Sequence, residues 1–394
     1  MKRSQSLKIV IASAGHRAHY LDWFRAALRS QGVRGEIIAL EYRESAPSFA
    51  GADRSVVVPA YNAPEYRETI ANWVRRESPD LFISLNDYEL QVLSAGLADE
   101  LRRTGCIVAS LESGAQSIVL DKYLMASTLT RRGLPSPVTW LGSQTDRVRS
   151  AKRNGRFVVK HRFGSGSTGL CFASAADLDD AVSESAKSAK GGDGGASSSG
   201  LDAVVVQELL PGAEYGVDGV YSLDGCGSLL GLLARRKDRM RGGDTDVATT
   251  VATEGFTVAM AALGDLLKPV GPIDVDFRED IDGTPLIIDV NPRFGGGYPF
   301  CHLAGADLPA HMVRSLAGLD HDPSLLSCRI GVKSARREEF SILDSAPTLS
   351  PTERDPRMSR PPARISSEAR GPHTSLWAGT GSGDAASAQT LPCR

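Results

Sequence analysis

The sequence lacks several features that would place the protein in a simple class. It contains no run of about 18 apolar residues, so it offers no candidate membrane-spanning helix. Lys and Arg total 45 against 47 for Asp and Glu, which gives no electrostatic reason to expect a nucleic acid or an anionic membrane as partner. The 6 cysteines form no CxxC pair. We therefore expect free thiols in a reducing cytoplasm rather than a disulfide framework or a zinc site.

Two common nucleotide-binding signatures are also missing. The turn after the first predicted strand reads SAGHRAHY and carries no GxGxxG, and no GxxxxGK[ST] occurs in the chain. A nicotinamide site and a Walker A loop are therefore not predicted. The chain has 394 residues, 41% hydrophobic and 23% charged, which excludes disorder over its whole length. This length suggests about two or three domains.

The pattern of apolar residues divides the chain into three parts. Residues 1–111 alternate β-rich runs such as LKIVIAS and GEIIALE with helical stretches, which predicts an α/β domain with a parallel sheet. Residues 112–334 begin with a predicted helix to about 140 and continue with hairpin-like strands, interrupted by a low-complexity stretch at 183–200 that we expect to be flexible. Residues 335–394 are rich in Pro, Ser, Gly and Arg and are predicted to be a disordered tail.

A hairpin near residue 282 brings acidic side chains together. The dipeptide DG at 282–283 is typical of a two-residue type I′ turn, which makes Asp276 face Asp289. The same turn makes Asp274 face Asn291. Alternate residues of a strand share a face, and like charges about 4.5–5.5 Å apart repel, so we interpret this face as a Mg²⁺ site beside phosphates. A solvated polar face, or another register from a different loop length, is the alternative.

A glycine-rich loop follows a strand that carries basic residues. The segment FVVKHRFGSGSTGL places Lys160 and Arg162 on one face of the strand, directly before the glycines at 164, 166 and 169. Glycines allow the backbone to approach a phosphate group, and the intervening hydroxyl residues add donors. Taken alone, such a loop is more often an ordinary hairpin turn. The segment SLNDYE lies at a strand end, where open α/β sheets bind ligands, although Asn86 or Asp87 can equally be a helix cap.

In their order along the chain, these segments resemble the ATP-grasp superfamily, and within it the carbamoyl-phosphate-synthase-like enzymes with a single ATP-grasp unit. The matching segments are LDKYLMAST, FVVKHRFGSGSTG, VVVQELLPGAEYGVDG, RMRGGDTDVATTV, IDVDF and IIDVNPRFGGG, over roughly residues 112–320. The resemblance implies a pre-ATP-grasp α/β domain at 1–111. It also implies a two-subdomain ATP-grasp fold (α/β and α+β) at 112–334, whose lid subdomain spans about 140–210.

The resemblance also implies roles for individual residues. ATP phosphates would be contacted by Lys122, Lys160 and the loop Gly164, Ser165, Gly166, Ser167, Thr168 and Gly169. The adenosine would be held by Gln207, Glu208, Leu209, Leu210 and Glu214. Two Mg²⁺ ions, replaceable by Mn²⁺, would be held by Asp276, Asp289 and Asn291, with Asp274 behind them. Arg293, and with less support Arg241, would act on the transferred phosphoryl group. Asp276 and Asp289 depart from the longer Gln or Glu of the family.

The implied activity is that of an ADP-forming ligase. ATP would convert a carboxylate into an acylphosphate, and an amine, from an amino acid or a peptide, would then displace phosphate. The alternatives are an ATP-grasp enzyme that uses ammonia, bicarbonate or a thiol as acceptor, and a non-catalytic, ATP-binding regulatory protein. The expected partners are small-molecule substrates, with a homodimer common among relatives. We expect neither a nucleic-acid nor a membrane partner, and a cytoplasmic location.

Overall fold

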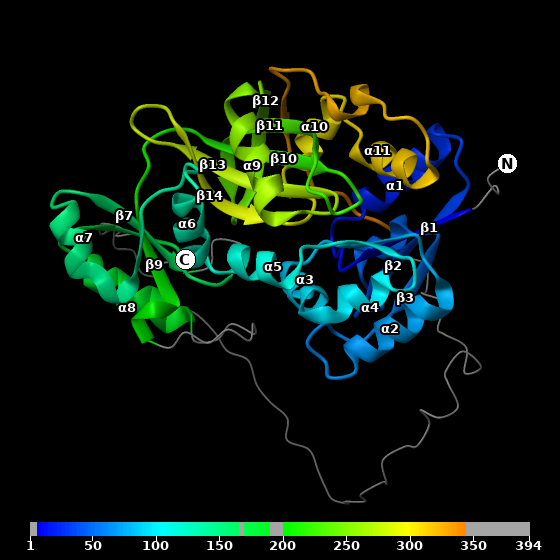
Figure 1. The fold of residues 1–394 in the computed structure, drawn as a ribbon, viewed down its shortest axis with the longest axis horizontal. Helices are drawn as coiled ribbons and strands as arrows, with labels where there is room; N and C mark the ends of the chain where they lie inside the picture. Colours follow the sequence, from blue (N-terminus) through cyan, green and yellow to red (C-terminus); the bar gives the residue numbers. More distant parts are fainter. Residues whose placement is uncertain (1–5, 165–168, 190–199, 344–394) are drawn as a thin grey trace, which may run out of the picture. The chain divides into compact units, whose positions relative to one another are not determined.

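The computed structural model describes residues 6–164, 169–189 and 200–343, and every structural statement below concerns these ranges (Figure 1). The N-terminal part is a five-stranded parallel sheet in the order β3-β2-β1-β4-β5. Its central strand is apolar on both faces, with Ile9 and Ile11 in one core and Val10 and Ala12 in another. A parallel strand covered by helices on both sides has this continuous apolar character, as the sequence predicts.

The elements of this part have the following bounds: β1 Leu7–Ala12, α1 His19–Ser30, β2 Gly35–Glu41, β3 Arg54–Val57, α2 Tyr66–Glu77, β4 Leu81–Ser84, α3 Asp87–Val92, α4 Ala98–Arg102 and β5 Ile107–Ala109. The runs LKIVIAS and GEIIALE, which the sequence predicts to be strands, form β1 and β2 of this sheet. The polar start of α3 also follows its sequence, because Asn86 caps the helix by accepting from the N–H groups of Tyr88 and Glu89.

The second sheet is antiparallel and carries the hairpin with the opposed acids. Its six strands lie in the order β14-β13-β10-β11-β12-β15. Their bounds are β10 Glu214–Tyr221, β11 Leu229–Arg241, β12 Asp244–Val251, β13 Pro272–Glu279, β14 Pro285–Asn291 and β15 Lys333–Ala335. Helices α5 Ser113–Leu120, α6 Lys122–Arg131 and α9 Thr257–Leu267 share a core with this sheet.

A third, smaller antiparallel sheet corresponds to the predicted lid. Its four strands lie in the order β6-β9-β7-β8, and α8 packs against it. The bounds are β6 Thr139–Leu141, α7 Thr145–Ala151, β7 Arg156–His161, β8 Cys171–Ser174, α8 Leu178–Ser188 and β9 Val204–Glu208. Two further helices, α10 Tyr298–Leu303 and α11 Leu308–Ala317, follow β14, and α11 packs on α1 of the N-terminal part (Figure 1).

Several details differ from the sequence-based expectations. The stretch from 112 to 140 contains two helices, because Asp121 ends the first and caps the second by accepting from the N–H groups of Tyr123 and Leu124. The first residues of the expected flexible stretch, 183–188, belong to α8, and 190–199 lie outside the described residues. Of the predicted tail, residues 344–394 also lie outside them, while Ala335 ends β15.

Four cysteines of the described residues, Cys106, Cys226, Cys301 and Cys328, are free, as the sequence predicts. No helix within the described ranges is long and apolar enough to cross a membrane.

Candidate active site

The β13–β14 hairpin has the predicted pairs of polar residues, but its turn and its register near the turn differ from the prediction. Asp276 pairs with Asp289 and Asp274 with Asn291, as the sequence predicts. Nearer the turn, however, the register shifts by one residue, so that Phe277 pairs with Ile287. The predicted two-residue turn is therefore wrong: the loop holds one extra residue, and a β-bulge at Ile288 compensates for it. The bulge restores the side-chain alternation that brings the two acids face to face.

Each of the two opposed acids is bound by a lysine. Lys122 Nζ lies 3.3 Å from Asp289 Oδ1, and Lys237 Nζ lies 2.7 Å from Asp276 Oδ1. Burial opposes the charged form of Asp289, but Lys122 and Lys160 outweigh it and hold its pKa below the ordinary value. At Asp276 burial prevails over Lys237 and raises the pKa. The two carboxylates therefore sit in unlike environments although they face each other.

Lys160 connects the lid sheet to the bulge. It lies on β7, and its Nζ donates a hydrogen bond of 3.2 Å to the carbonyl oxygen of Ile288, the bulged residue. Burial and the charge of Lys122 lower the pKa of Lys160 from 10.5 to about 8, against the opposing effect of Asp289. Lys122 also donates to the carbonyl oxygen of Gly164, 2.9 Å away, at the start of the glycine loop. Both predicted phosphate lysines thus point toward the hairpin.

Arg293 is held by the N-terminal part of the chain. Its Nε and Nη2 atoms donate to the two carboxylate oxygens of Asp87 at 2.6 and 2.9 Å. Burial acts to lower the pKa of Arg293, but Asp87 outweighs it and the pKa is raised, so the guanidinium stays charged. Such a two-point bond fixes the plane of the guanidinium. The alternative role of Asp87 as a helix cap is not needed, because Asn86 performs it.

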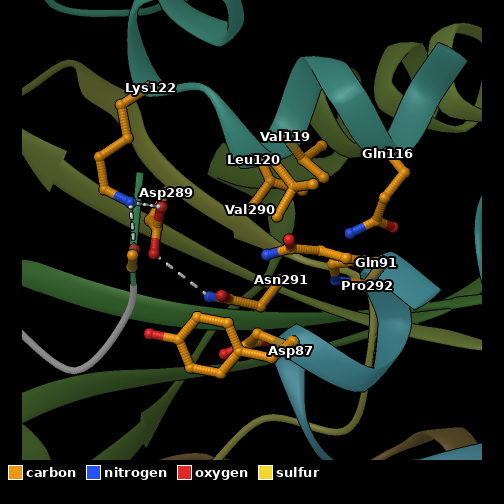
Figure 2. A pocket seen from close by; sticks show the side chains of 12 residues that line it. Asp87, Gln91, Gln116, Val119, Leu120, Lys122, Asp289, Val290, Asn291 and Pro292 are labelled. Atoms are coloured by element: carbon orange, nitrogen blue, oxygen red, sulfur yellow. Dashed lines mark hydrogen bonds and ion pairs between the residues drawn. The ribbon is translucent and has the colours of Figure 1, made fainter. Parts of the chain in front are cut away.

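A pocket lies where these groups meet. It is lined by Lys122, Gly164 and the β14 end from Asp289 to Pro292, together with residues of α3 and α5. Figure 2 shows Lys122 and Asn291 pointing toward Asp289 from different elements, with Gln91 and Gln116 at the other side. The Asn291 amide nitrogen lies 3.4 Å from Asp289 Oδ2. The pocket therefore combines a cation, carboxylate oxygens and amides in one place.

Asp274 belongs to a buried ion cluster behind the hairpin. Arg235 on β11 donates to Asp274 Oδ1 at 2.7 Å and also to Asp218 on β10. The side chain of Arg235 is 1% exposed. A Cβ atom at Gly295 would lie 2.4 Å from Asp274, and one at Gly297 would lie 2.0 Å from Arg235 Nε. Gly295 and Gly297 are therefore required by close packing over this ion cluster.

The predicted adenosine residues lie on and after β9. Gln207 is buried and donates to Thr139 Oγ1 at 2.7 Å, whereas Glu208 is partly exposed and pairs with Lys152. The N–H group of Leu209 is bonded to the Arg156 carbonyl, while that of Leu210 makes no hydrogen bond with any described residue. The Leu210 N–H is thus available to a ligand.

Glu214 and Arg241 have different surroundings. Glu214 accepts from Lys237 at 2.9 Å and from Arg278 at 3.2 Å, which links it to Asp276 through Lys237. Arg241 is exposed at the end of β11, where it pairs with Glu338 and has no hydrogen bond or ion pair with another predicted site residue that the structure describes. The structure thus does not bring Arg241 together with the rest. Ser165, Gly166, Ser167 and Thr168 lie outside the described residues.

Sequence reasoning missed Lys237, the partner of both Asp276 and Glu214. A signal was present in LLARRKDRMR, where Arg235 and Lys237 alternate on one face of an otherwise apolar strand. Over the described part of the chain, no group of three or more His, Cys, Asp or Glu is arranged to hold a metal ion. An oxygen-ligand site on the hairpin would therefore consist of Asp276, Asp289 and the Asn291 amide.

Two family models match the chain. Residues 9–109 match the model of the PylC-like N-terminal domain. Residues 201–335 match a model described as an ATP-grasp in the biosynthetic pathway with Ter operon. A search of curated proteins gave no match.

Solved structures show the same fold at low sequence identity. Biotin carboxylase from Campylobacter jejuni has a TM-score of 0.63 at 16% identity, covering 84% of this chain and 75% of that one. The biotin carboxylase domain of Hydrogenobacter thermophilus 2-oxoglutarate carboxylase, solved with MgADP and bicarbonate, has a TM-score of 0.63 at 16% identity and covers 83% and 73%. N5-carboxyaminoimidazole ribonucleotide synthetase from Thermotoga maritima has a TM-score of 0.58 at 16% identity and covers 81% and 78%.

The family models and the arrangement of the three sheets agree with each other and with the resemblance found in the sequence. Residues 201–335 thus match an ATP-grasp domain, and residues 9–109, ahead of it, match a PylC-like N-terminal domain.

Proposed function

We propose that the protein is an ATP-dependent, ADP-forming carboxylate–amine ligase. The observation that carries this proposal is the convergence of Lys122 and Lys160 on the hairpin that holds Asp276, Asp289 and Asn291. A triphosphate needs cations, and a bound Mg²⁺ needs oxygen ligands; this site offers both within one small volume. A site that only bound a neutral metabolite would have no use for two converging lysines.

The nucleotide would extend from the lid sheet, which borders the adenine, to the β13–β14 hairpin, which borders the phosphates. Gln207, Glu208 and the backbone of Leu209 and Leu210 border the adenine, with the free N–H of Leu210 as the donor available to the ring. Glu214 holds the ribose hydroxyls. Lys122, Lys160 and the glycine loop from Gly164 to Gly169 contact the phosphates.

The hairpin suits magnesium by its chemistry. Asp276, Asp289 and Asn291 offer hard oxygen ligands on one face, and both acids already lie beside cationic groups. When bound, Mg²⁺ would neutralise charge on the phosphate oxygens and act as a Lewis acid there. We propose that these residues hold two Mg²⁺ ions.

The residues of the chain perform the remaining tasks. A substrate carboxylate and the γ-phosphoryl group repel each other, and the charges of Lys122, Lys160 and Arg293 offset that repulsion. Arg293 can offset this charge in a fixed orientation, because its guanidinium forms an ion pair with Asp87 of the N-terminal domain. The carboxylate oxygen attacks the γ-phosphorus and ADP leaves. The amine then attacks the acyl carbon of the acylphosphate, expels phosphate and loses a proton.

Two alternative functions would use the same nucleotide site. An ATP-grasp enzyme with ammonia, bicarbonate or a thiol as acceptor would use the same nucleotide site with a different second substrate. A non-catalytic regulatory protein would bind ATP without releasing ADP. It would not require Arg293 to be held between the domains in the way that the two hydrogen bonds to Asp87 hold it.

The decisive experiment measures ADP release by the purified protein over a matrix of carboxylic acids and amines. Hydroxylamine is added in a parallel series to trap an activated acyl group as a hydroxamate. An acid that yields a hydroxamate without any amine identifies the first substrate and supports the proposal. Asp289→Asn is the inactive comparison, and Asp282→Asn in the exposed turn of the same hairpin is its matched control. Nucleotide binding without ADP release under any condition would favour the regulatory function instead.

A further inference from the structure

A second cavity lies away from the nucleotide site, beside the outer edge of the N-terminal sheet. It has a volume of about 390 Å³ and shares no lining residue with the pocket at Asp289. One wall is formed by the end of α4 and by β5, and the other by the turn between β10 and β11 and by the residues after α9. This volume lies within the range of about 300–1,000 Å³ in which proteins bind small molecules.

Both walls of the cavity contribute aliphatic side chains. Ile107 and Val108 come from β5, Leu223 from the turn after β10, and Val270 from the segment after α9. A branched aliphatic group placed between these side chains would lose its contact with water, which favours binding. The cavity therefore suits a ligand that has an aliphatic portion.

Lys268 and Asp224 add opposite charges that are not paired with each other. Among the described residues, Lys268 forms an ion pair only with Asp265, at 3.5 Å, and the Asp265 side chain is 85% exposed, so this pair contributes little. Asp224 forms no ion pair with any described residue, and its hydrogen bonds from Ser222 Oγ and from the N–H of Cys226 both reach Oδ1. The Lys268 ammonium and Asp224 Oδ2 can therefore each bind a group of a ligand.

The opposite wall also carries charges of both signs. Arg102 Nη1 lies 3.0 Å from Asp99 Oδ1 and 3.8 Å from Glu112 Oε1. An anion in the cavity would meet Asp224 and Glu112, and a cation would meet Lys268 and Arg102. Because like charges repel, a ligand with a single charge is disfavoured, and a ligand that carries both charges matches the lining.

The edge of β5 adds a backbone donor. The N–H of Ile107 donates to the Asp80 carbonyl on the side of β4, so the N–H of the next residue, Val108, points to the free edge of the sheet. This N–H forms no hydrogen bond with any described residue, although Val108 is 1% exposed. A buried N–H without a partner costs free energy, which favours an acceptor beside it.

We infer that this cavity binds an α-amino acid with a branched aliphatic side chain. The carboxylate of the amino acid accepts from Lys268 and from the Val108 N–H, and its ammonium group donates to Asp224. Its side chain lies among the aliphatic residues of the two walls. The inference does not depend on the proposed function, because the cavity and the pocket at Asp289 have no residue in common.

The test is a calorimetric titration of the full chain, without nucleotide, with L-valine, L-isoleucine and L-leucine at neutral pH. We expect at least one of the three to bind with a dissociation constant of about 1 mM or tighter. The amino acid that binds best is compared with the same molecule lacking the amino group and with the same molecule lacking the carboxylate; for leucine these are 4-methylpentanoate and 3-methylbutylamine. Each analogue should bind at least about tenfold more weakly, because it lacks one charge-assisted contact.

Two substitutions at exposed positions assign the contacts. Asp224→Asn and Lys268→Met should each weaken binding of the amino acid at least about tenfold. Asp224→Asn should not weaken binding of the analogue without an amino group any further, because the group that Asp224 binds is already absent. The matched controls are Asp282→Asn, in the β13–β14 turn, and Lys187→Met, on α8; both residues are exposed, and both variants should bind as the wild type does.

The outcomes separate this inference from the proposed function. If none of the three amino acids binds the wild type, or if either Asp224→Asn or Lys268→Met binds as tightly as the wild type, the inference is wrong. Lys122→Ala, in the pocket at Asp289, should leave the affinity unchanged, and loss of binding in this variant would place the amino acid in that pocket and overturn the inference as well. The titration requires neither ATP nor ADP release, so the absence of ligase activity would count against the proposed function alone.

Discussion

Arg235 offers the sharpest test of how the core beneath the hairpin is stabilised. Its side chain is 1% exposed and is bonded to Asp218 and Asp274, whose side chains are 2% and 10% exposed. Arg235→Leu removes the cation and leaves two carboxylates in the interior. Breaking a buried ion pair costs about 3–5 kcal/mol, a large part of the roughly 5–15 kcal/mol that stabilises a typical folded protein.

The loss of unfolding free energy caused by Arg235→Leu should be larger at high pH than at low pH. Burial raises the pKa of Asp218 even with Arg235 present, so without the cation the folded state prefers the protonated acid. A folded-state pKa above the unfolded value means that stability falls as pH rises toward that pKa. Urea denaturation followed by circular dichroism should therefore show the full loss near pH 8 and a smaller one near pH 5.5.

The neighbouring arginine provides the control. Arg236 is 49% exposed and pairs with Asp238, so Arg236→Leu should cost at most about 1 kcal/mol, without this pH trend. A loss below about 1 kcal/mol for Arg235→Leu near pH 8, or an equal loss at both pH values, would refute the reasoning.

Three further predictions concern the site. Asp289→Ala and Arg293→Ala should each abolish ADP formation while thermal unfolding stays cooperative; full turnover by either purified variant would contradict the assignment. The pKa of Lys160 is lowered to about 8, so nucleotide affinity measured by calorimetry should fall as pH rises through 8. Over pH 8 to 10.5 the free energy of unfolding should rise, because the unfolded chain binds more protons than the folded one. If affinity and the free energy of unfolding changed in the same direction with pH, the assignment of this pKa would be wrong. Gly297→Ala should lower the melting temperature because its Cβ would lie 2.0 Å from a buried atom, whereas Gly296→Ala, with its nearest atom at 3.9 Å, should not; equal effects would disprove the packing argument.

The fold could be predicted where the pattern along the chain is local and strong. The continuous apolar runs of β1 and β2 and the helical spacing between them indicate a parallel sheet, and the structure has it. The acid pair on the hairpin was predicted for a reason that is only half correct, because the extra loop residue and the bulge at Ile288 cancel each other. Turn and bulge geometry depends on packing that residue types alone do not specify.

Partners distant in the sequence could not be predicted. Asp87 and Arg293 are 206 residues apart, and nothing in either local segment indicates that they form a pair. Lys237 shows the same limit, since its position on an apolar strand marks it as unusual but does not name Asp276 and Glu214 as its partners. Arg241 shows the opposite case: it lies in a segment that matches the family, but its side chain pairs with Glu338 on the surface.

The position of the acid pair depends on the bulge and not on the length of the turn. Residues 281–283 lie between Asp280 and Thr284, which are hydrogen-bonded to each other, so a turn shortened by one residue can keep every pair of the hairpin. If β14 instead lost the bulge without losing a residue, Asp276 would pair with Ile288, and Asp289 would turn to the other face. The hydrogen bond from Lys160 to the Ile288 carbonyl therefore fixes the part of the hairpin that keeps the acids together, and changes in turn length should be tolerated better than the loss of the bulge.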